Sequence, residues 1–137
     1  MKEENLMLVP CEVATKCVLP VVRAMMAQEL ITKHKLTQME AAKRIGVSQP
    51  AISLYHRKIR GRAISLEKEG RITRLIENLS ASLAEGKLTH QEFIPAFCEI
   101  CKAIRSKGLM CELHKAFDPA INVKDCNLCS VVTAKCM

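Results

Sequence analysis

The chain has 137 residues and a formal net charge of +7, from 21 Lys and Arg against 14 Asp and Glu. It is 49% hydrophobic, which excludes a disordered chain, and its 3% aromatic residues and few Gly and Pro argue against a β-barrel or sandwich. It has no run of 18 apolar residues and no secretory signal pattern, so we expect a cytoplasmic protein without a membrane partner. In a reducing compartment, its eight cysteines are expected to be metal ligands or redox groups before disulfides.

Positive charge and cysteine are concentrated in opposite halves of the chain. Residues 1–65 hold 11 Lys and Arg against 5 Asp and Glu, whereas residues 66–137 hold 10 against 9. No acidic residue occurs between Glu40 and Glu67, and six of the eight cysteines lie in 98–136. We therefore expect a basic domain over 1–65, and over 66–137 a helical connector followed by a cysteine-rich module.

Apolar spacing and capping residues predict an all-α fold, beginning with a helix after Pro20. Thr37 is a candidate N-cap for a second helix that stops at Gly46. Ser48 is a candidate N-cap for a third helix, with Pro50 tolerated in its first turn.

Two longer helices are predicted in the second half. Apolar residues at helical spacing predict an amphipathic helix from Arg71 to Glu85. The sequence from Thr89 to Glu92 is a capping box that opens the next helix, which Gly108 ends. Pro95 is expected to kink that helix or to shift its start.

The segment 38–57 has the pattern of a helix-turn-helix. Ala42 is small enough for the point where two helices cross, and Gly46 accepts the left-handed backbone of a sharp turn. The apolar residues expected to face inward are Ile45, Val47, Ile52 and Tyr55. The outward side of the second helix is then mostly polar and suits base edges in a major groove.

The expected function of this basic domain is binding of double-stranded DNA. Gln49 and Arg57 are the expected base-reading residues, and the basic run from Arg57 onward would meet phosphates. The alternative is an ordinary helical hairpin whose basic side is only solvated. The residues expected to contact DNA are Gln38, Ser48, Gln49, Ser53, Leu54, His56, Arg57, Lys58, Arg60 and Arg62.

Three short units in the C-terminal part carry soft metal ligands: Cys98-x2-Cys101, Cys111-x2-His114 and Cys126-x2-Cys129. On a helix, positions i and i+3 share one side, so each unit presents two ligands together. Paired spacing of this kind indicates a bound metal centre. Two disulfides are one alternative, which a reducing compartment disfavours. Merely buried cysteines are the other, and they do not explain the paired spacing.

The nature of the metal centre stays open between an iron–sulfur cluster and zinc. The pairs have aliphatic neighbours and lack the Gly or Pro of zinc knuckles, which favours an apolar pocket for a [4Fe–4S] cluster over a closed zinc site. Four ligands are expected from the five clustered thiols Cys98, Cys101, Cys111, Cys126 and Cys129, with Cys111 as a replacement or spare. His114 is a weaker candidate. The other three cysteines, Cys11, Cys17 and Cys136, are interpreted as packing residues.

The chain resembles the predicted archaeal transcriptional regulators with a phage-repressor-type helix-turn-helix. The motifs that carry the resemblance are Pro10-Cys11-Glu12-Val13, Leu19-Pro20-Val21-Val22-Arg23-Ala24, Leu36-Thr37-Gln38, Gly46-Val47-Ser48-Gln49 and Arg60-Gly61, with the three cysteine units resembling the tail of one branch. The resemblance implies a cytoplasmic, dimeric repressor or activator whose tail binds a metal or an iron–sulfur cluster.

The sequence therefore predicts a homodimeric DNA-binding regulator that reports oxygen, redox state or iron and sulfur supply. In this hypothesis the helix from Arg71 to Glu85 couples the cluster to the DNA-binding part, unless its apolar stripe is simply core. The alternatives are a zinc-stapled regulator without sensing, and an iron–sulfur electron carrier or enzyme subunit. We expect no enzyme, because the chain has no Gly-rich nucleotide loop, no nucleophile with a base at a recognisable spacing and no paired carboxylate site. No small-molecule substrate is evident from the sequence.

Overall fold

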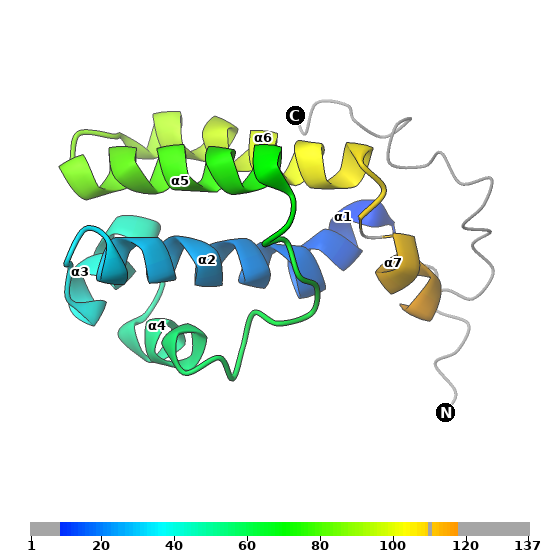
Figure 1. The fold of residues 1–137 in the computed structure, drawn as a ribbon, viewed down its shortest axis with the longest axis horizontal. Coiled ribbons are helices and arrows are strands. Elements are labelled where there is room, and N and C mark those ends of the chain that lie inside the picture. The colour runs from blue at the N-terminus through cyan, green and yellow to red at the C-terminus, as the bar shows by residue number, and fades with distance from the viewer. Residues whose placement is uncertain (1–8, 110, 118–137) are drawn as a thin grey trace.

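The computed structural model describes residues 9–109 and 111–117, and every regular element in this part of the chain is a helix (Figure 1). The all-α class is therefore confirmed for these residues. The elements are α1 (Pro10–Val13), the π-helical η2 (Ala14–Val18), α2 (Leu19–Thr32), α3 (Gln38–Ile45), α4 (Gln49–His56), α5 (Gly70–Glu85), α6 (His90–Ser106) and α7 (Cys111–Phe117).

Helix α2 is the centre of the fold. It has α3 and α4 on one side and α5 and α6 on the other, while α1 and α7 lie together at one end (Figure 1). Because it has neighbours on opposite sides, α2 buries apolar residues on more than one face, as a central helix must. Its buried residues are Val21, Val22, Met26, Ala27 and Leu30.

The N-terminal helix begins earlier than its sequence predicts. The expected start was after Pro20, but the helical path runs from Pro10 through η2 into α2, where Pro20 occupies the first turn. Proline has no backbone N–H. It fits the first turn of an α-helix because the N–H groups of that turn have no carbonyl partner within the α-helix. The preceding turn is π-helical, with the Leu19 N–H bonded to the Ala14 carbonyl.

The predicted caps are confirmed at both ends of α3 and at the start of α4. The Thr37 hydroxyl accepts from the Glu40 N–H at 3.1 Å and the Glu40 carboxylate accepts from the Thr37 N–H at 2.9 Å, a complete capping box. Gly46 ends α3 with φ +85°, and Ser48 caps α4.

The second half follows its prediction with one difference. Thr89 and Glu92 form the expected capping box, and Gly86 and Gly108 have left-handed backbones after α5 and α6. Pro95 does not shift the start of α6, which runs without interruption from His90. The reason is that the capping box holds the first turn, while Pro95 costs only one bond in the second.

One hydrophobic core joins the two parts of the chain. Buried residues of α2, α3 and α4 belong to the same cluster as those of α5 and α6, so the core continues across the predicted division at residues 65 and 66. The side chain of Arg44 also crosses it, because its Nη1 donates to the carbonyls of Leu83 at 2.5 Å and Ala84 at 2.9 Å. These carbonyls lie in the last turn of α5, where a cation is favoured.

No helix in the described ranges combines the length and the apolar character that a membrane span requires.

Candidate nucleic-acid interface and thiol cluster

The turn between α3 and α4 has the geometry that its sequence predicts. The N–H groups of Gly46 and Val47 both bond to the carbonyl of Ala42, at 2.8 and 3.0 Å, which closes the end of α3. The Ser48 hydroxyl then accepts from the Ala51 N–H at 3.2 Å and opens α4. The residues expected to face inward do so: Ala42, Ile45, Ile52 and Tyr55 are buried, and Val47 is half-buried against the core.

The two helices are further connected by a pair of glutamines. The Gln49 amide nitrogen donates to the Gln38 amide oxygen at 2.8 Å and so connects the first residues of α4 and α3. Gln49 is the first residue of α4 and is exposed, whereas Gln38 is half-buried at the start of α3. The contact therefore holds an exposed amide at the N-terminal end of α4.

The remaining predicted DNA contacts differ in exposure. The exposed ones are Ser48, His56, Arg57, Lys58, Arg60 and Arg62, while Ser53 and Leu54 are half-buried. The Leu54 carbonyl accepts from the N–H groups of Ile59 and Arg60, so this residue also shapes the end of α4.

The basic segment after α4 is held against the body of the protein. The guanidinium of Arg60 lies over the ring of Tyr55, 5.9 Å from its centroid, and Arg62 donates to the Lys58 carbonyl at 3.3 Å. Gly61 fits tightly against α2, because a Cβ at this position would stand 2.7 Å from the Ala24 Cβ and from the Pro20 carbonyl oxygen. The basic segment thus contacts the body of the protein at Tyr55 and at α2.

The cysteines of the first predicted unit lie on one side of α6. Cys98 is exposed and Cys101 is half-buried one turn later, and both carry free thiols. Burial raises the pKa of the Cys101 thiol, while the adjacent charge and hydrogen bond of Arg105 act in the opposite direction. The predicted pairing on one helical side is thus present for Cys98 and Cys101.

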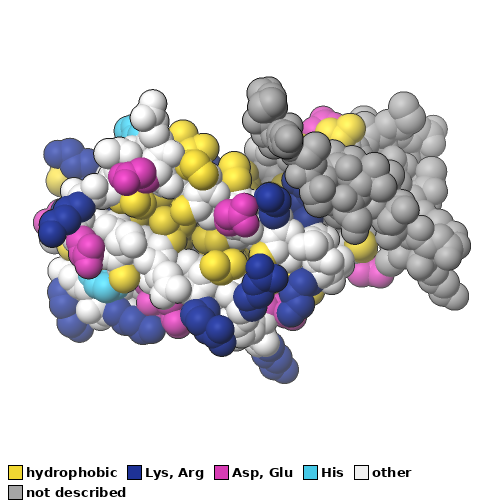
Figure 2. Space-filling model, turned by 90° about the horizontal axis from the view of Figure 1, so that it is seen from above, with side chains coloured by type: hydrophobic (Ala, Val, Ile, Leu, Met, Phe, Trp, Pro, Cys, Tyr) yellow, Lys and Arg dark blue, Asp and Glu magenta, His cyan; other side chains and the backbone are white. Residues whose placement is uncertain are grey.

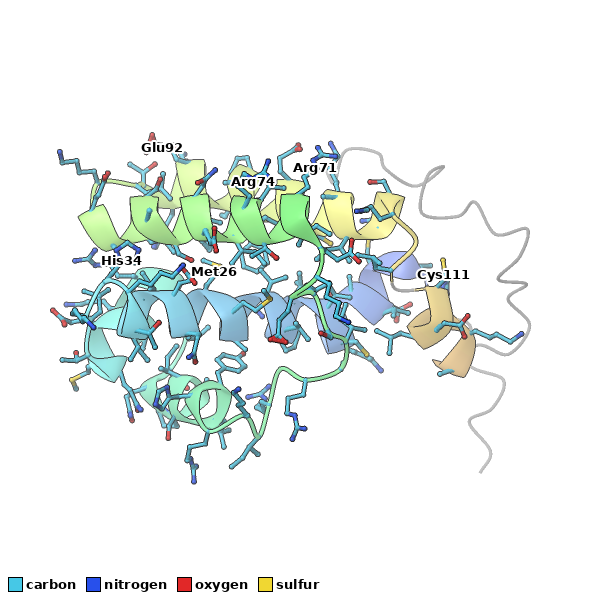
Figure 3. The ribbon with its side chains drawn as sticks, in the orientation of Figure 1. Met26, His34, Arg71, Arg74, Glu92 and Cys111 are labelled. Carbon is cyan, nitrogen blue, oxygen red and sulfur yellow. The ribbon has the colours of Figure 1, made fainter. Side chains whose placement is uncertain are left out.

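Cys111 lies close to the end of the same helix. It is the first residue of α7, and its Sγ would be only 3.7 Å from a Cβ built on Gly108, the residue that ends α6 (Figure 3). His114 is on the same short helix and is only 2% exposed. The other two predicted ligands, Cys126 and Cys129, fall outside the described residues, as does Cys136.

Cys11 lies beside this group, which sequence reasoning did not anticipate. Arg105 of α6 is 6% exposed, and its Nη1 lies 3.9 Å from the Cys11 Sγ of α1. Cys11 and Cys98 are both near enough to Cys101 to affect its titration. We call Cys11, Cys98 and Cys101 with Arg105 the thiol cluster. Cys17, in contrast, is buried in the core, in agreement with a packing role.

The thiol cluster has the donor chemistry of a soft metal site but not the spacing for a single ion. Among the residues that the structure describes, no three His, Cys, Asp or Glu side chains are grouped closely enough to hold one metal ion. Thiolates suit zinc and iron–sulfur clusters. The ligands of a [4Fe–4S] cluster each bind a different iron atom, so they surround a larger group than a single ion.

Comparison of the chain with protein-family models, with curated proteins and with solved structures finds no match.

Proposed function

We propose that this protein is a sequence-specific regulator that binds double-stranded DNA through α4. The observation that carries the proposal is the capped, glycine-turned pair of α3 and α4, with Gln49 exposed at the start of α4 and oriented by Gln38. In helix-turn-helix proteins the N-terminal residues of the second helix contact base edges in the major groove. A glutamine amide can bond to both hydrogen-bonding groups of adenine in that groove.

The basic segment supports the same function. The cations of Arg57, Lys58, Arg60 and Arg62 follow α4 directly and are exposed, and no carboxylate interrupts the chain until Glu67. Contacts to phosphates fix the position of a protein on DNA and supply most of the non-specific affinity. The loop around Gly61, which contacts α2, would present these cations to the backbone beside the groove that α4 enters.

We also propose that the protein binds DNA as a homodimer, and we compare two surfaces as its interface. The surface of α5 and α6 exposes apolar atoms, including Ile94, among charged ones (Figure 2). Arg71, Arg74 and Glu92 point outward on that side, which is opposite to α4 (Figure 3). A two-fold dimer through this surface would turn the two copies of α4 in opposite directions, so that one straight duplex could not bind both.

We therefore propose the end formed by α1 and α7 as the dimer interface. A two-fold axis at this end, parallel to the direction from α5 to α4, would place both copies of α4 on the same side of the dimer, as half-sites about 34 Å apart require. The thiol cluster lies at the same end, so a change there would alter the angle between the two copies. The proposal is therefore a cytoplasmic regulator that senses redox state, oxygen or iron and sulfur supply.

The proposed cofactor is a [4Fe–4S] cluster held by four thiolates, drawn from Cys98, Cys101, Cys111, Cys126 and Cys129, with structural zinc as the second candidate. When bound, the cluster would supply a group that oxygen or iron shortage can degrade. The apolar residues Ile100 and Ile104 are buried on α6 close to Cys101 and would limit water there. A zinc-stapled regulator without sensing would use the same thiols.

Selection from a random duplex library tests the DNA proposal directly. The wild-type protein should enrich one defined sequence, and a variant with Gln49→Ala and Arg57→Ala should enrich none while keeping its helical circular dichroism. Arg74→Ala, on the opposite side of the fold, is the matched control and should select the wild-type sequence. If the double variant keeps the wild-type preference, neither residue reads bases.

Anaerobic purification tests the cofactor. A brown protein with absorbance near 400 nm and about four irons per chain is expected. A colourless protein with stoichiometric zinc would contradict the cluster and leave the zinc-stapled regulator.

A further inference from the structure

The position of Cys11 differs from that of the other N-terminal cysteine in ways that point to a ligand. Cys17 is buried in the core among apolar residues, whereas Cys11 is half-buried and its sulfur faces a guanidinium. Cys11 also lines an open hollow of about 250 Å³ with Glu12, Thr15 and Lys16. Cys11 is therefore not enclosed in the core, unlike Cys17.

Arg105 connects Cys11 to the cysteines of α6. Cys98, Cys101 and Arg105 are spaced by three and four residues, so they follow one side of the helix. Arg105 is buried at the C-terminal end of this row, and its Nη1 is 3.9 Å from the Cys11 Sγ. Thiols from opposite ends of the sequence thus share one buried cation.

A buried cation beside several thiols suits a group that carries negative charge. Metals are bound by thiolates, whose negative charge a neighbouring guanidinium offsets. A cluster held by four thiolates remains anionic, and hydrogen bonds and charges near its sulfurs tune it. Arg105 is placed to provide both to Cys11 and Cys101.

We infer that Cys11 is a ligand of the iron–sulfur cluster proposed for this protein, together with Cys98 and Cys101. This inference depends on the cofactor part of the proposed function and adds a ligand from α1 to it. The bond from Cys11 would tie α1 to α6 through the cluster. Since α1 continues through η2 into α2, which contacts α3 and α4, the state of the cluster would be transmitted to the DNA-binding helices along one helical path.

The test compares Cys11→Ser with Cys17→Ser and Cys101→Ser in the full-length protein. Each is purified anaerobically and reconstituted with ferrous iron and sulfide, or in a second arm with zinc alone, and bound metal is measured. Cys11→Ser and Cys101→Ser should retain less than about half of the wild-type iron, and Cys17→Ser should retain all of it. Thermal unfolding of each variant checks that it is folded.

A second measurement needs no variant. Wild-type protein with and without the cluster is treated with iodoacetamide, and the modified cysteines are identified by mass spectrometry. The cluster should slow alkylation of Cys11, Cys98 and Cys101 together, by about tenfold or more, because a coordinated thiolate is not a free nucleophile.

The outcomes separate the inference from the proposals on which it depends. Wild-type iron content in Cys11→Ser, or alkylation of Cys11 that the cluster does not slow, overturns the ligand assignment and leaves the cofactor proposal in place. Protein that binds only zinc, or no metal, overturns both. If the wild-type protein selects no sequence from the duplex library, the regulator proposal alone is overturned.

Discussion

The side-chain amide of Gln49 donates a 2.8 Å hydrogen bond to the side-chain oxygen of Gln38. Gln49 is the first residue of α4, and Gln38 is the first residue of α3. This bond fixes which group of Gln49 stays available, since the Gln49 oxygen and its second N–H are not used by Gln38. An oriented amide loses less freedom when it binds a base than a mobile one does.

The two glutamines should therefore be coupled in DNA binding. We expect Gln49→Ala to cost about 1–3 kcal/mol of affinity for the selected sequence, the usual value of a paired base contact. Gln38→Ala should cost less, because Gln38 acts by positioning Gln49. Fluorescence anisotropy on the single and double variants measures the coupling. Additive losses would show that Gln38 does not act through Gln49.

Arg62 is expected to contribute through charge rather than through sequence reading. It is exposed after α4 and bonded only to the Lys58 carbonyl among the contacts that the structure gives for it. Arg62→Ala should weaken binding about equally for all duplexes and reduce the slope of log affinity against log salt by about 1. Arg74→Ala removes the same charge from the opposite side and should leave the slope unchanged. Equal slopes in both variants would remove Arg62 from the phosphate contacts.

Arg44 is expected to matter for stability although it lies in the basic window. Its guanidinium bonds to the carbonyls of Leu83 and Ala84 at the end of α5 and is partly buried there. Arg44→Ala should lower the free energy of unfolding by about 1.5–3 kcal/mol, the range for hydrogen bonds to a charged group. Urea denaturation measures this, with the exposed neighbour Lys43→Ala as control, which should be within about 0.5 kcal/mol of wild type. Equal stabilities of the two variants would contradict the role of Arg44.

The glycines at 61 and 46 should differ in their tolerance of alanine. Both have positive φ, +75° and +85°, so alanine costs roughly 1–2 kcal/mol of backbone strain at either position. At Gly46 a Cβ meets nothing within 4 Å, whereas at Gly61 it would clash with Ala24 and with the Pro20 carbonyl. Gly61→Ala should therefore be the more destabilising by about 1–3 kcal/mol. Thermal unfolding compares them, and a smaller effect at Gly61 would mean that the loop can move off α2.

Glu92 should make the stability of α6 depend on pH. The N–H and hydroxyl of Thr89 donate to its carboxylate at 2.9 and 3.0 Å, and these hydrogen bonds lower the pKa of Glu92 in the folded protein. A pKa lowered by folding contributes stability above the unfolded pKa, and this is lost as pH falls through the folded value. Glu92→Gln keeps an acceptor but has no carboxylate, so its unfolding temperature should fall less from neutral pH to about pH 3. An unchanged acid dependence would show that the carboxylate is not responsible.

Much of the local structure was predictable from sequence because its causes are local. Thr37, Gly46, Ser48, Thr89 and Gly108 mark helix ends through bonds and backbone angles within a few residues of each one. The inward positions of α3 and α4 also followed from spacing. Two crossing helices with a sharp turn need a small residue, a glycine and apolar residues at fixed separations along the sequence. The start of the first helix was missed because π-helical bonding before Pro20 leaves no simple signal in the sequence.

What only the tertiary structure decided involves residues far apart in the chain. Arg44 belongs to the basic window by composition, but packing of α3 against α5 brings it to the carbonyls of Leu83 and Ala84. Cys11 lies outside every cysteine pair, and only the meeting of α1 with the end of α6 places it beside Arg105. Sequence thus determined most of the helix ends and the inward positions of α3 and α4, because caps, turns and apolar periods act over a few residues. The roles of individual cations and thiols depend on the neighbours that the fold supplies, and spacing along the chain carries no information about those neighbours.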